Sequence, residues 1–244
     1  MNITLDSPAT GIWRLHQRRP VPVNAYLVEA GPDLILVDTG SPGRPGEMLG
    51  AVHAVAASTG KRLSAVALTH GHFDHVGGLA EVAAYTGVPV YTHPDELPFI
   101  RGERSYGELR GWWGYRRRGW GRSPVLLPDA DLRPLPEGAT LGPLRACHTP
   151  GHAPGHLAYY HAATATWLAG DLLMYNLRAL TGPIWFFTYD LAAVRRSAGR
   201  LLEPAAVQAI CPGHGVVLRQ LDKLRAYLRR YGVNPGGSSG ETGA

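Results

Sequence analysis

Short apolar runs separated by turn-forming residues recur along the whole chain and predict a strand-rich protein. The run Leu34-Ile35-Leu36-Val37 is apolar throughout, which is typical of a strand buried on both faces. In the first half of the chain we expect strands at 12–16, 22–29, 34–37, 63–68 and 88–91. In the second half we expect them at 131–135, 144–148, 157–161, 166–169 and 207–211.

Segments with helical spacing of apolar residues lie between these strands. In 46–59, for example, Met48, Val52 and Val55 recur at intervals that place them on one helix face. Further helices are expected at 79–85, 94–97, 190–202 with Asp190 as the N-cap, and 218–231. Strands and helices that alternate in this way predict an α/β protein.

The length and composition are those of a globular protein with a substantial core. A chain of 244 residues with 45% hydrophobic residues can bury the core of one large domain or of two closely packed halves. We therefore expect residues 1–234 to form one domain. The Gly- and Ser-rich end predicts a disordered tail at 235–244.

Charge and cysteine content narrow the class further. The formal net charge is +5, with Lys61 and Lys223 as the only lysines, and this modest excess does not by itself indicate a nucleic-acid partner. Two cysteines, Cys147 and Cys211, are too few for a disulfide framework, so we expect a cytoplasmic protein. The first residues have no signal-peptide pattern, and no apolar run approaches the ~18 residues of a membrane span.

The most distinctive stretch is Thr69-His70-Gly71-His72-Phe73-Asp74-His75-Val76-Gly77-Gly78, between an expected strand and an expected helix. Imidazole and carboxylate groups are good ligands for Zn²⁺ or Fe. Because residues two apart in an extended segment point the same way, His70 and His72 can converge on one metal ion. Asp74 and His75 lie beyond the turn and are free to reach a second ion. Sites in α/β proteins commonly lie at such strand ends.

This motif resembles that of the metallo-β-lactamase superfamily of metallohydrolases. Four more stretches follow the order of that family: Leu36-Val37-Asp38-Thr39-Gly40, His148-Thr149-Pro150-Gly151-His152, Ala169-Gly170-Asp171 and Pro212-Gly213-His214-Gly215. Together they extend over nearly the whole chain. The resemblance implies an αββα sandwich with its site along one edge of two facing sheets.

The resemblance also implies the metal ligands. They form two sets joined by a bridging carboxylate: His70, His72 and His152; Asp74, His75 and His214; and Asp171 between them. Two divalent ions, with Zn²⁺ favoured over Fe or Mn, would polarise a shared water, and the bridging hydroxide would be the nucleophile. Asp74 is then a candidate catalytic residue that receives or orients the proton.

Three residues are expected beside this centre. Asp38 would support the metal loop through hydrogen bonds in the resembled family, although a strand-end Asp could also be a turn residue. His156 is expected to donate a supporting hydrogen bond, with a purely structural histidine as the alternative. Tyr175 follows Asp171 by four positions, where lactonases carry a substrate-binding tyrosine one position nearer. We therefore consider Tyr175 a candidate catalytic residue, with a core tyrosine as the alternative.

An Arg- and Trp-rich segment at about 100–124 interrupts the sheet-like pattern and indicates an insertion. As a cap over the metal cleft it would contribute Trp112, Trp113 and Arg116 to substrate binding. Its composition also suits a subunit contact, as in a homodimer. A nucleic-acid surface is the least favoured interpretation.

The complete ligand set is similar to that of glyoxalase II thioesterases, acyl-homoserine-lactone lactonases and tRNA 3′-processing nucleases. An aspartate at position 171 disfavours a true zinc β-lactamase, and His72 disfavours a flavodiiron protein. We expect a dinuclear hydrolase acting on a small-molecule acyl bond, with lactones or esters ahead of thioesters. The alternatives are a mononuclear iron persulfide dioxygenase, an RNA- or phosphodiester-cleaving nuclease, and a non-catalytic binding module.

Overall fold

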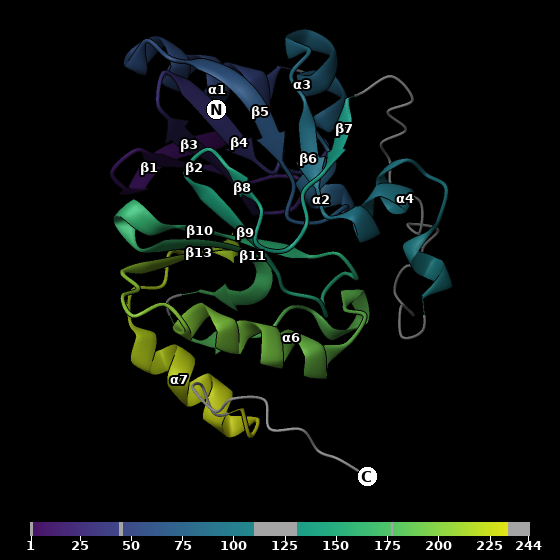
Figure 1. The fold of residues 1–244 in the computed structure, drawn as a ribbon, viewed down its shortest axis with the longest axis vertical. Coiled ribbons are helices and arrows are strands. Elements are labelled where there is room, and N and C mark those ends of the chain that lie inside the picture. Colours follow the sequence, from purple (N-terminus) through teal and green to yellow (C-terminus); the bar gives the residue numbers. More distant parts are fainter. Residues whose placement is uncertain (1, 44–45, 110–130, 177, 234–244) are drawn as a thin grey trace.

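Two facing β-sheets with helices on both outer sides form the protein (Figure 1). The structure is a computed structural model that describes residues 2–43, 46–109, 131–176 and 178–233. The layers follow in the order helix, sheet, sheet, helix, which confirms the expected αββα sandwich. Among the described residues no helix is long and apolar enough to span a membrane.

The first sheet has seven strands in chain order. They are β1 (Ile3–Ala9), β2 (Ile12–Gln17), β3 (Val23–Ala30), β4 (Asp33–Val37), β5 (Arg62–Ala67), β6 (Val90–Thr92) and β7 (Leu132–Pro134). Strands β1 to β4 form an antiparallel meander, whereas β4 to β7 pair in parallel. The parallel strands need crossover connections, and the metal-ligand candidates of residues 70–75 lie on the connection that follows β5.

The second sheet has the order β12-β11-β10-β9-β8, and β13 pairs with β11 in parallel. Its strands are β8 (Thr140–Leu141), β9 (Leu144–His148), β10 (Leu157–His161), β11 (Thr166–Tyr175), β12 (Leu180–Thr181) and β13 (Ala209–Gly215). The first sheet meets the second through β13, because the side chains of Asn24 and Tyr26 both donate hydrogen bonds to the carbonyl of Pro212.

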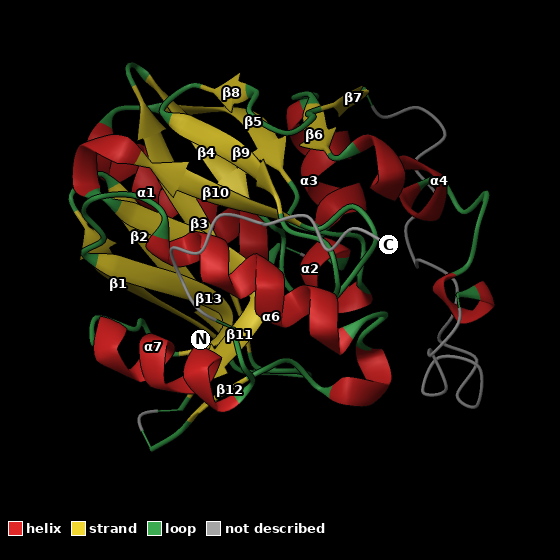
Figure 2. Ribbon diagram, turned by 60° about the horizontal axis from the view of Figure 1, so that its bottom comes forward, coloured by secondary structure: helices red, strands yellow, loops and turns green. Residues whose placement is uncertain are grey.

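Helices cover the outer faces of both sheets. Helices α1 (Glu47–Thr59) and α3 (Leu79–Thr86) lie on the first sheet, and α6 (Leu191–Gly199) and α7 (Leu221–Arg230) lie on the second. Figure 2, seen from the side of α6 and α7, shows these two helices in front of the strands. Two short helices, α2 (Phe73–Val76) and α4 (Leu97–Ile100), lie near the edge where the ligand candidates gather.

Alternation along the buried strands produces three apolar layers. Leu36 of β4 packs with Val52 of α1 on the outer side of the first sheet, whereas Val37 packs with Leu157 between the sheets. A third layer, which includes Leu224 of α7, lies outside the second sheet. Because both faces of the central strands are covered, their sequences are apolar at almost every position.

Several strand predictions need correction. Strand β1 was not expected because Thr4 and Asp6 interrupt its apolar residues, and most of this edge strand is exposed. The two-residue strands β8 and β12 were also missed, and β13 extends to Gly215 rather than ending at residue 211. Strand β11 runs to Tyr175 rather than ending at residue 169, because Gly170 takes a positive φ of 49° and the strand continues after a shift in register. Asp171 therefore lies within a strand and not on a loop.

Candidate metal centre

Five histidines and two aspartates meet at one edge of the two sheets. His70 and His72 come from the loop after β5, Asp74 and His75 from α2, His152 from the loop after β9, Asp171 from β11 and His214 from β13. In three overlapping groups the candidate ligand atoms all lie within 4.8 Å of one another: His70, His72 and His152; His70, His75 and Asp171; Asp74, His75 and His214. The structure thus brings together all seven residues that the sequence analysis proposed as ligands.

The carboxylate of Asp171 lies at the centre of this cluster. Its Oδ1 is 3.3 Å from Nε2 of His75, and its Oδ2 is 3.4 Å from Nε2 of both His152 and His214. Nε2 of His214 also lies 3.2 Å from Oδ2 of Asp74. Gly213 permits this arrangement, because a Cβ there would lie only 2.3 Å from Oδ1 of Asp171. One carboxylate can therefore contact groups on both sides of it.

Buried polar atoms without hydrogen-bond partners point to metal binding. Nε2 of His70 is buried and makes no hydrogen bond, and the buried Nε2 of His75 and Oδ1 of Asp171 lie 3.3 Å from each other without a hydrogen bond of normal geometry. Leaving such groups unpaired typically costs about 1–3 kcal/mol each. Imidazole nitrogens and carboxylate oxygens at these spacings are the donor set that divalent Zn, Fe or Mn ions take. The residues therefore fit a metal centre.

Asp38 orients two of the imidazoles. Nδ1 of His75 donates a hydrogen bond to Oδ2 of Asp38 over 2.7 Å. The hydroxyl of Thr69 donates to the same carboxylate and accepts from Nδ1 of His70 over 3.0 Å. In both histidines Nδ1 is engaged in a hydrogen bond, so Nε2 is the nitrogen that points into the cluster. The structure therefore places Asp38 where it can support the metal ligands.

His152 and His214 are oriented by other partners. Nδ1 of His152 donates to the Thr188 hydroxyl over 3.2 Å, and that hydroxyl donates to the carbonyl of Ile184 over 2.9 Å. Nδ1 of His214 donates to the carbonyl of Pro22 over 2.6 Å. Thr188 was not identified from the sequence, because its partner lies 36 positions away and no local motif joins the two.

The electrostatic environment divides the histidines into two kinds. Burial, together with neighbouring imidazoles, holds the pKa of His70 and His72 well below the usual value and lowers the pKa of His152 to about 4. Burial would also lower the pKa of His75 and His214. However, Asp171 with Asp38 raises the pKa of His75 well above its usual value, and Asp171 with Asp74 raises that of His214 to about 10.

His156 supports Asp171, but not by donating to it. The backbone N–H of Asp171 donates to Nε2 of His156 over 3.0 Å, and Nδ1 of His156 donates to the hydroxyl of Thr149 over 2.8 Å. His156, which was expected to donate a hydrogen bond toward the metal cluster, therefore accepts one there through Nε2. The reason is geometric, because His156 faces the backbone of β11 rather than the Asp171 carboxylate.

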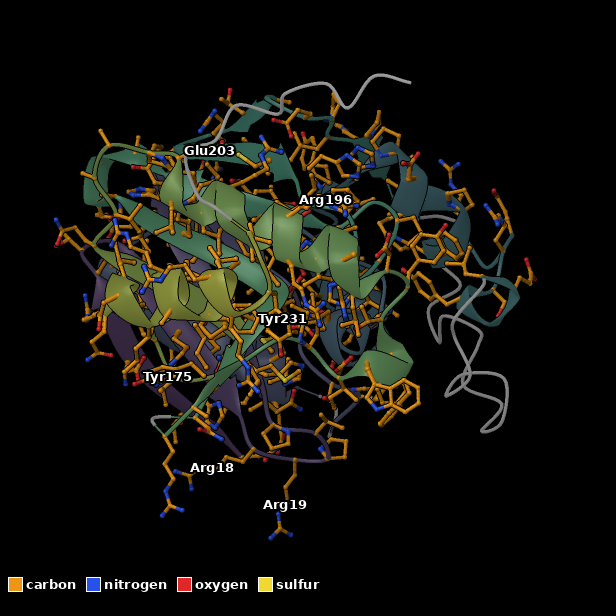
Figure 3. The ribbon with its side chains drawn as sticks, turned by 90° about the horizontal axis from the view of Figure 1, so that it is seen from below. Arg18, Arg19, Tyr175, Arg196, Glu203 and Tyr231 are labelled. Carbon is orange, nitrogen blue, oxygen red and sulfur yellow. The ribbon has the colours of Figure 1, made fainter. Side chains whose placement is uncertain are left out.

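Tyr175 does not reach the cluster, which corrects its assignment as a catalytic residue. Its side chain is 3% exposed and belongs to the apolar layer beside α7 (Figure 3). The hydroxyl donates to Gln220 and accepts from Lys223. Neighbouring residues of a strand point to opposite faces, and it is Met174 that lines the cavity beside the cluster.

A buried glutamate joins two of the ligand loops. The carboxylate of Glu96 accepts from the N–H of Gly71 over 2.9 Å, from the N–H of Gly155 over 2.7 Å and from the hydroxyl of Tyr106. Burial raises its pKa despite these donors. The sequence analysis treated Glu96 only as part of a helical turn. A signal was present, since an acidic residue directly precedes the apolar run 97–100.

A cavity of about 440 Å³ opens beside the cluster. Five of the ligand candidates line it together with apolar residues: His72, Asp74, His152, Asp171 and His214, with Val21, Pro22, Phe73, Met174, Ile184 and Phe187. Its volume lies within the usual range for small-molecule sites. Trp112, Trp113 and Arg116 lie outside the described residues, so their role in substrate binding stays a prediction.

The fold and the buried cluster define a metal-binding protein of the αββα class. Comparison with known proteins agrees. A family model for the metallo-beta-lactamase superfamily matches residues 18–214, and the chain belongs to that superfamily. The probable metallo-hydrolase YybB of Bacillus subtilis is 30% identical over 212 residues, which cover 86% of this chain and 89% of the relative.

Solved structures show the same likeness. TTHA1623 in a di-iron-bound form is 36% identical, with a TM-score of 0.65 over 85% of this chain and 93% of that one. The metallo-beta-lactamase family protein TTHA1429 from Thermus thermophilus is 27% identical, with a TM-score of 0.68 over 91% and 80% of the two chains. Family membership and the His/Asp cluster together support a metal-dependent enzyme of the metallo-hydrolase type.

Proposed function

We propose that this protein is a dinuclear metallohydrolase that cleaves an acyl C–O or C–S bond in a small molecule, with lactones or esters ahead of thioesters. The observation that carries the proposal is the position of the Asp171 carboxylate, 3.3–3.4 Å from imidazoles on both sides and beside a cavity. A carboxylate in this position can hold two cations close together.

The proposed ligand sets are those of the sequence analysis. His70, His72 and His152, called the first group below, would hold one ion, and Asp74, His75 and His214, the second group, would hold the other. Asp171 would contact both. We favour Zn²⁺, with Fe or Mn as alternatives, and the di-iron-bound form of TTHA1623 supports including iron. Bound ions of this kind supply Lewis acidity and lower the pKa of water.

A side chain of the protein, Asp74, would accept the proton that water releases. Asp74 lines the cavity and its Oδ2 lies 3.2 Å from Nε2 of His214, so it can accept a proton from water at the cavity wall. In the reaction, the oxygen of water forms a bond to the acyl carbon and the bond to the alkoxide or thiolate breaks. The proton from water ends on the leaving group, and no other reactant is needed.

The decisive experiment is a metal-by-substrate panel. Metal-free protein is reloaded separately with Zn²⁺, Fe²⁺ or Mn²⁺, metal per chain is measured by plasma emission, and each form is assayed with lactones, esters, thioesters, a phosphodiester and a cephalosporin. We expect close to two ions per chain and turnover of acyl substrates. Turnover of only the phosphodiester or only the cephalosporin would overturn the proposed class. A single iron with oxygen consumption on a persulfide would establish the dioxygenase alternative.

A further inference from the structure

Among the described residues, the side chains that line the cavity beside the metal centre are apolar except for those of the ligand candidates. These apolar side chains come from four separate segments: Val21 and Pro22 before β3, Phe73 from α2, Met174 from β11, and Ile184 and Phe187 from the turn after β12. Among the described residues that line it, the ionisable side chains are those of the proposed ligand sets and Asp171. The described part of the cavity therefore offers no arginine or lysine to a charged substrate group.

Two arginines close in the chain to the wall residue Val21 do not change this picture. Arg18 and Arg19 precede Val21 in the chain, but both side chains are exposed and project outward from the molecule in Figure 3. A carboxylate or phosphate placed against the apolar wall would lose its hydration without gaining a counter-ion, which is strongly unfavourable. The part of the cavity formed by the described residues therefore disfavours substrates with a charged group next to the scissile bond.

The apolar wall is held at a fixed position relative to the metal centre. The hydroxyl of Thr188 joins the carbonyl of Ile184 to Nδ1 of His152, and the carbonyl of Pro22 accepts from Nδ1 of His214. Each of these two wall segments is thus linked directly to one imidazole of the cluster. A substrate group that fills the wall would consequently set the distance between its carbonyl and the metal centre.

We propose that the acyl substituent of the substrate is an uncharged hydrocarbon chain that packs against Phe187, Ile184 and Met174. This inference rests on the proposed hydrolysis and specifies its substrate class. Burial of each methylene contributes about 0.8 kcal/mol, which corresponds to roughly a fourfold gain in kcat/KM per added carbon. The gain should stop when the chain has filled the cavity.

The first test uses p-nitrophenyl esters from acetate to octanoate, with monoesters of dicarboxylic acids of matched length, on the metal-loaded full-length protein. We expect kcat/KM to rise about fourfold per methylene over the first few members and to fall at least about tenfold when the chain ends in a carboxylate. A flat series, or a preference for the carboxylate esters, would overturn the substrate class. Hydrolysis of p-nitrophenyl acetate would still uphold the proposed function, whereas failure to hydrolyse any of the esters would count against that function itself.

The second test changes the wall. Phe187→Ala should reduce the gain per methylene to less than about twofold while metal content stays unchanged. Trp185→Ala is the matched control, because Trp185 belongs to the same turn (η4, Trp185–Phe187) but is 65% exposed and does not line the cavity. Equal chain-length dependence in wild type and Phe187→Ala would refute the assignment of this wall.

A variant that introduces a positive charge into the wall completes the test. Ile184 is 42% exposed, so Ile184→Lys should fold, which circular dichroism and metal content would verify. We expect it to lose long-chain preference and to hydrolyse the carboxylate-ended esters better than wild type does. No change in preference, in a folded variant with intact metal content, would show that the substrate does not contact Ile184.

Discussion

The two proposed ligand groups use the same residue types but are prepared for metal in opposite ways. The imidazoles of the first group are buried among one another, and their pKa values are lowered, so they are neutral before a metal ion arrives. In the second group, carboxylates raise the pKa values of His75 and His214, which favours the protonated form of both in the metal-free protein. The second group must therefore release protons to bind a metal ion.

This difference indicates that the residue types of a ligand group do not by themselves set its affinity for a metal ion. Each group contains imidazoles that hydrogen bonds orient toward the centre, but the groups differ in their carboxylates. Asp38 and Asp74 lie directly beside imidazoles of the second group, whereas in the first group His152 lies beside Asp171, which both groups share. We infer that the first group is ready to bind metal over a wide pH range. Occupancy of the second group should depend on pH and on the charge of Asp171.

The largest effect is expected from Asp171→Asn, which removes the charge shared by the two groups. We expect kcat/KM to fall by about a thousandfold or more, because several kcal/mol of metal-dependent stabilisation are lost. In the metal-free variant the pKa of His214 should drop from about 10 toward its usual value. Activity assays and histidine titration by NMR test both points. Two retained ions with full activity would contradict the bridging role.

Metal uptake should show the next largest effect, as a function of pH. The variant His152→Gln removes a ligand of the first group, so its metal uptake reports on the second group. His214→Gln removes a ligand of the second group and reports on the first. Because each displaced proton raises the affinity about tenfold per pH unit, uptake by the second group should strengthen roughly 100-fold from pH 6 to 8 for one displaced proton. The first group should change little above the low pKa of about 4. Calorimetry in two buffers counts the released protons, and equal counts for the two variants would refute the comparison.

The stability of the metal-free protein should follow the same division. The lowered pKa values of the first group favour the folded protein above the unfolded value of ~6.5, and this contribution is lost as pH falls from there toward 4. The raised pKa of His214 has the opposite sign. Its contribution is present below ~6.5 and is lost as pH rises through about 10. Urea unfolding between pH 4 and 10 should therefore show a loss of stability at both ends.

A smaller effect on metal affinity is expected when the residues that orient the imidazoles are replaced, and the affected group should depend on which residue is changed. Asp38→Ala affects His75 directly and His70 through Thr69, so metal affinity should fall about 10- to 100-fold in both groups. Thr188→Val should lower affinity only in the first group, by about tenfold, and Thr188→Ser should restore it. If Thr188→Val weakened both groups equally, the link from Thr188 to His152 would not be the cause.

The smallest effect is expected from Tyr175→Phe. Because its hydroxyl contacts Lys223 and Gln220 and not the cavity, kcat/KM on lactones and esters should change less than about twofold. Unfolding free energy should fall by roughly 1 kcal/mol for the lost hydrogen bonds. A large loss of activity with intact metal content would return Tyr175 to the site and would show that β11 faces the other way.

The sequence by itself determined which residue types reach the centre and in what order. Ligand motifs such as residues 69–78 are local, and buried strands such as residues 34–37 are marked by apolar runs, so neither needs tertiary information. The same holds for the Asp190 cap, whose carboxylate accepts from the N–H groups of Ala192 and Ala193. These features follow from interactions within a few residues.

Only the tertiary structure decided how those residues are used. A register shift at Gly170 determines that Met174 and not Tyr175 faces the cavity, and no pattern in the sequence announces that shift. Glu96 joins two loops that are distant in the chain, so its role exists only once those loops are close. The opposite pKa shifts of His152 and His214 depend on distances to carboxylates on other strands. Electrostatic and packing effects act through space, and local sequence does not encode those distances.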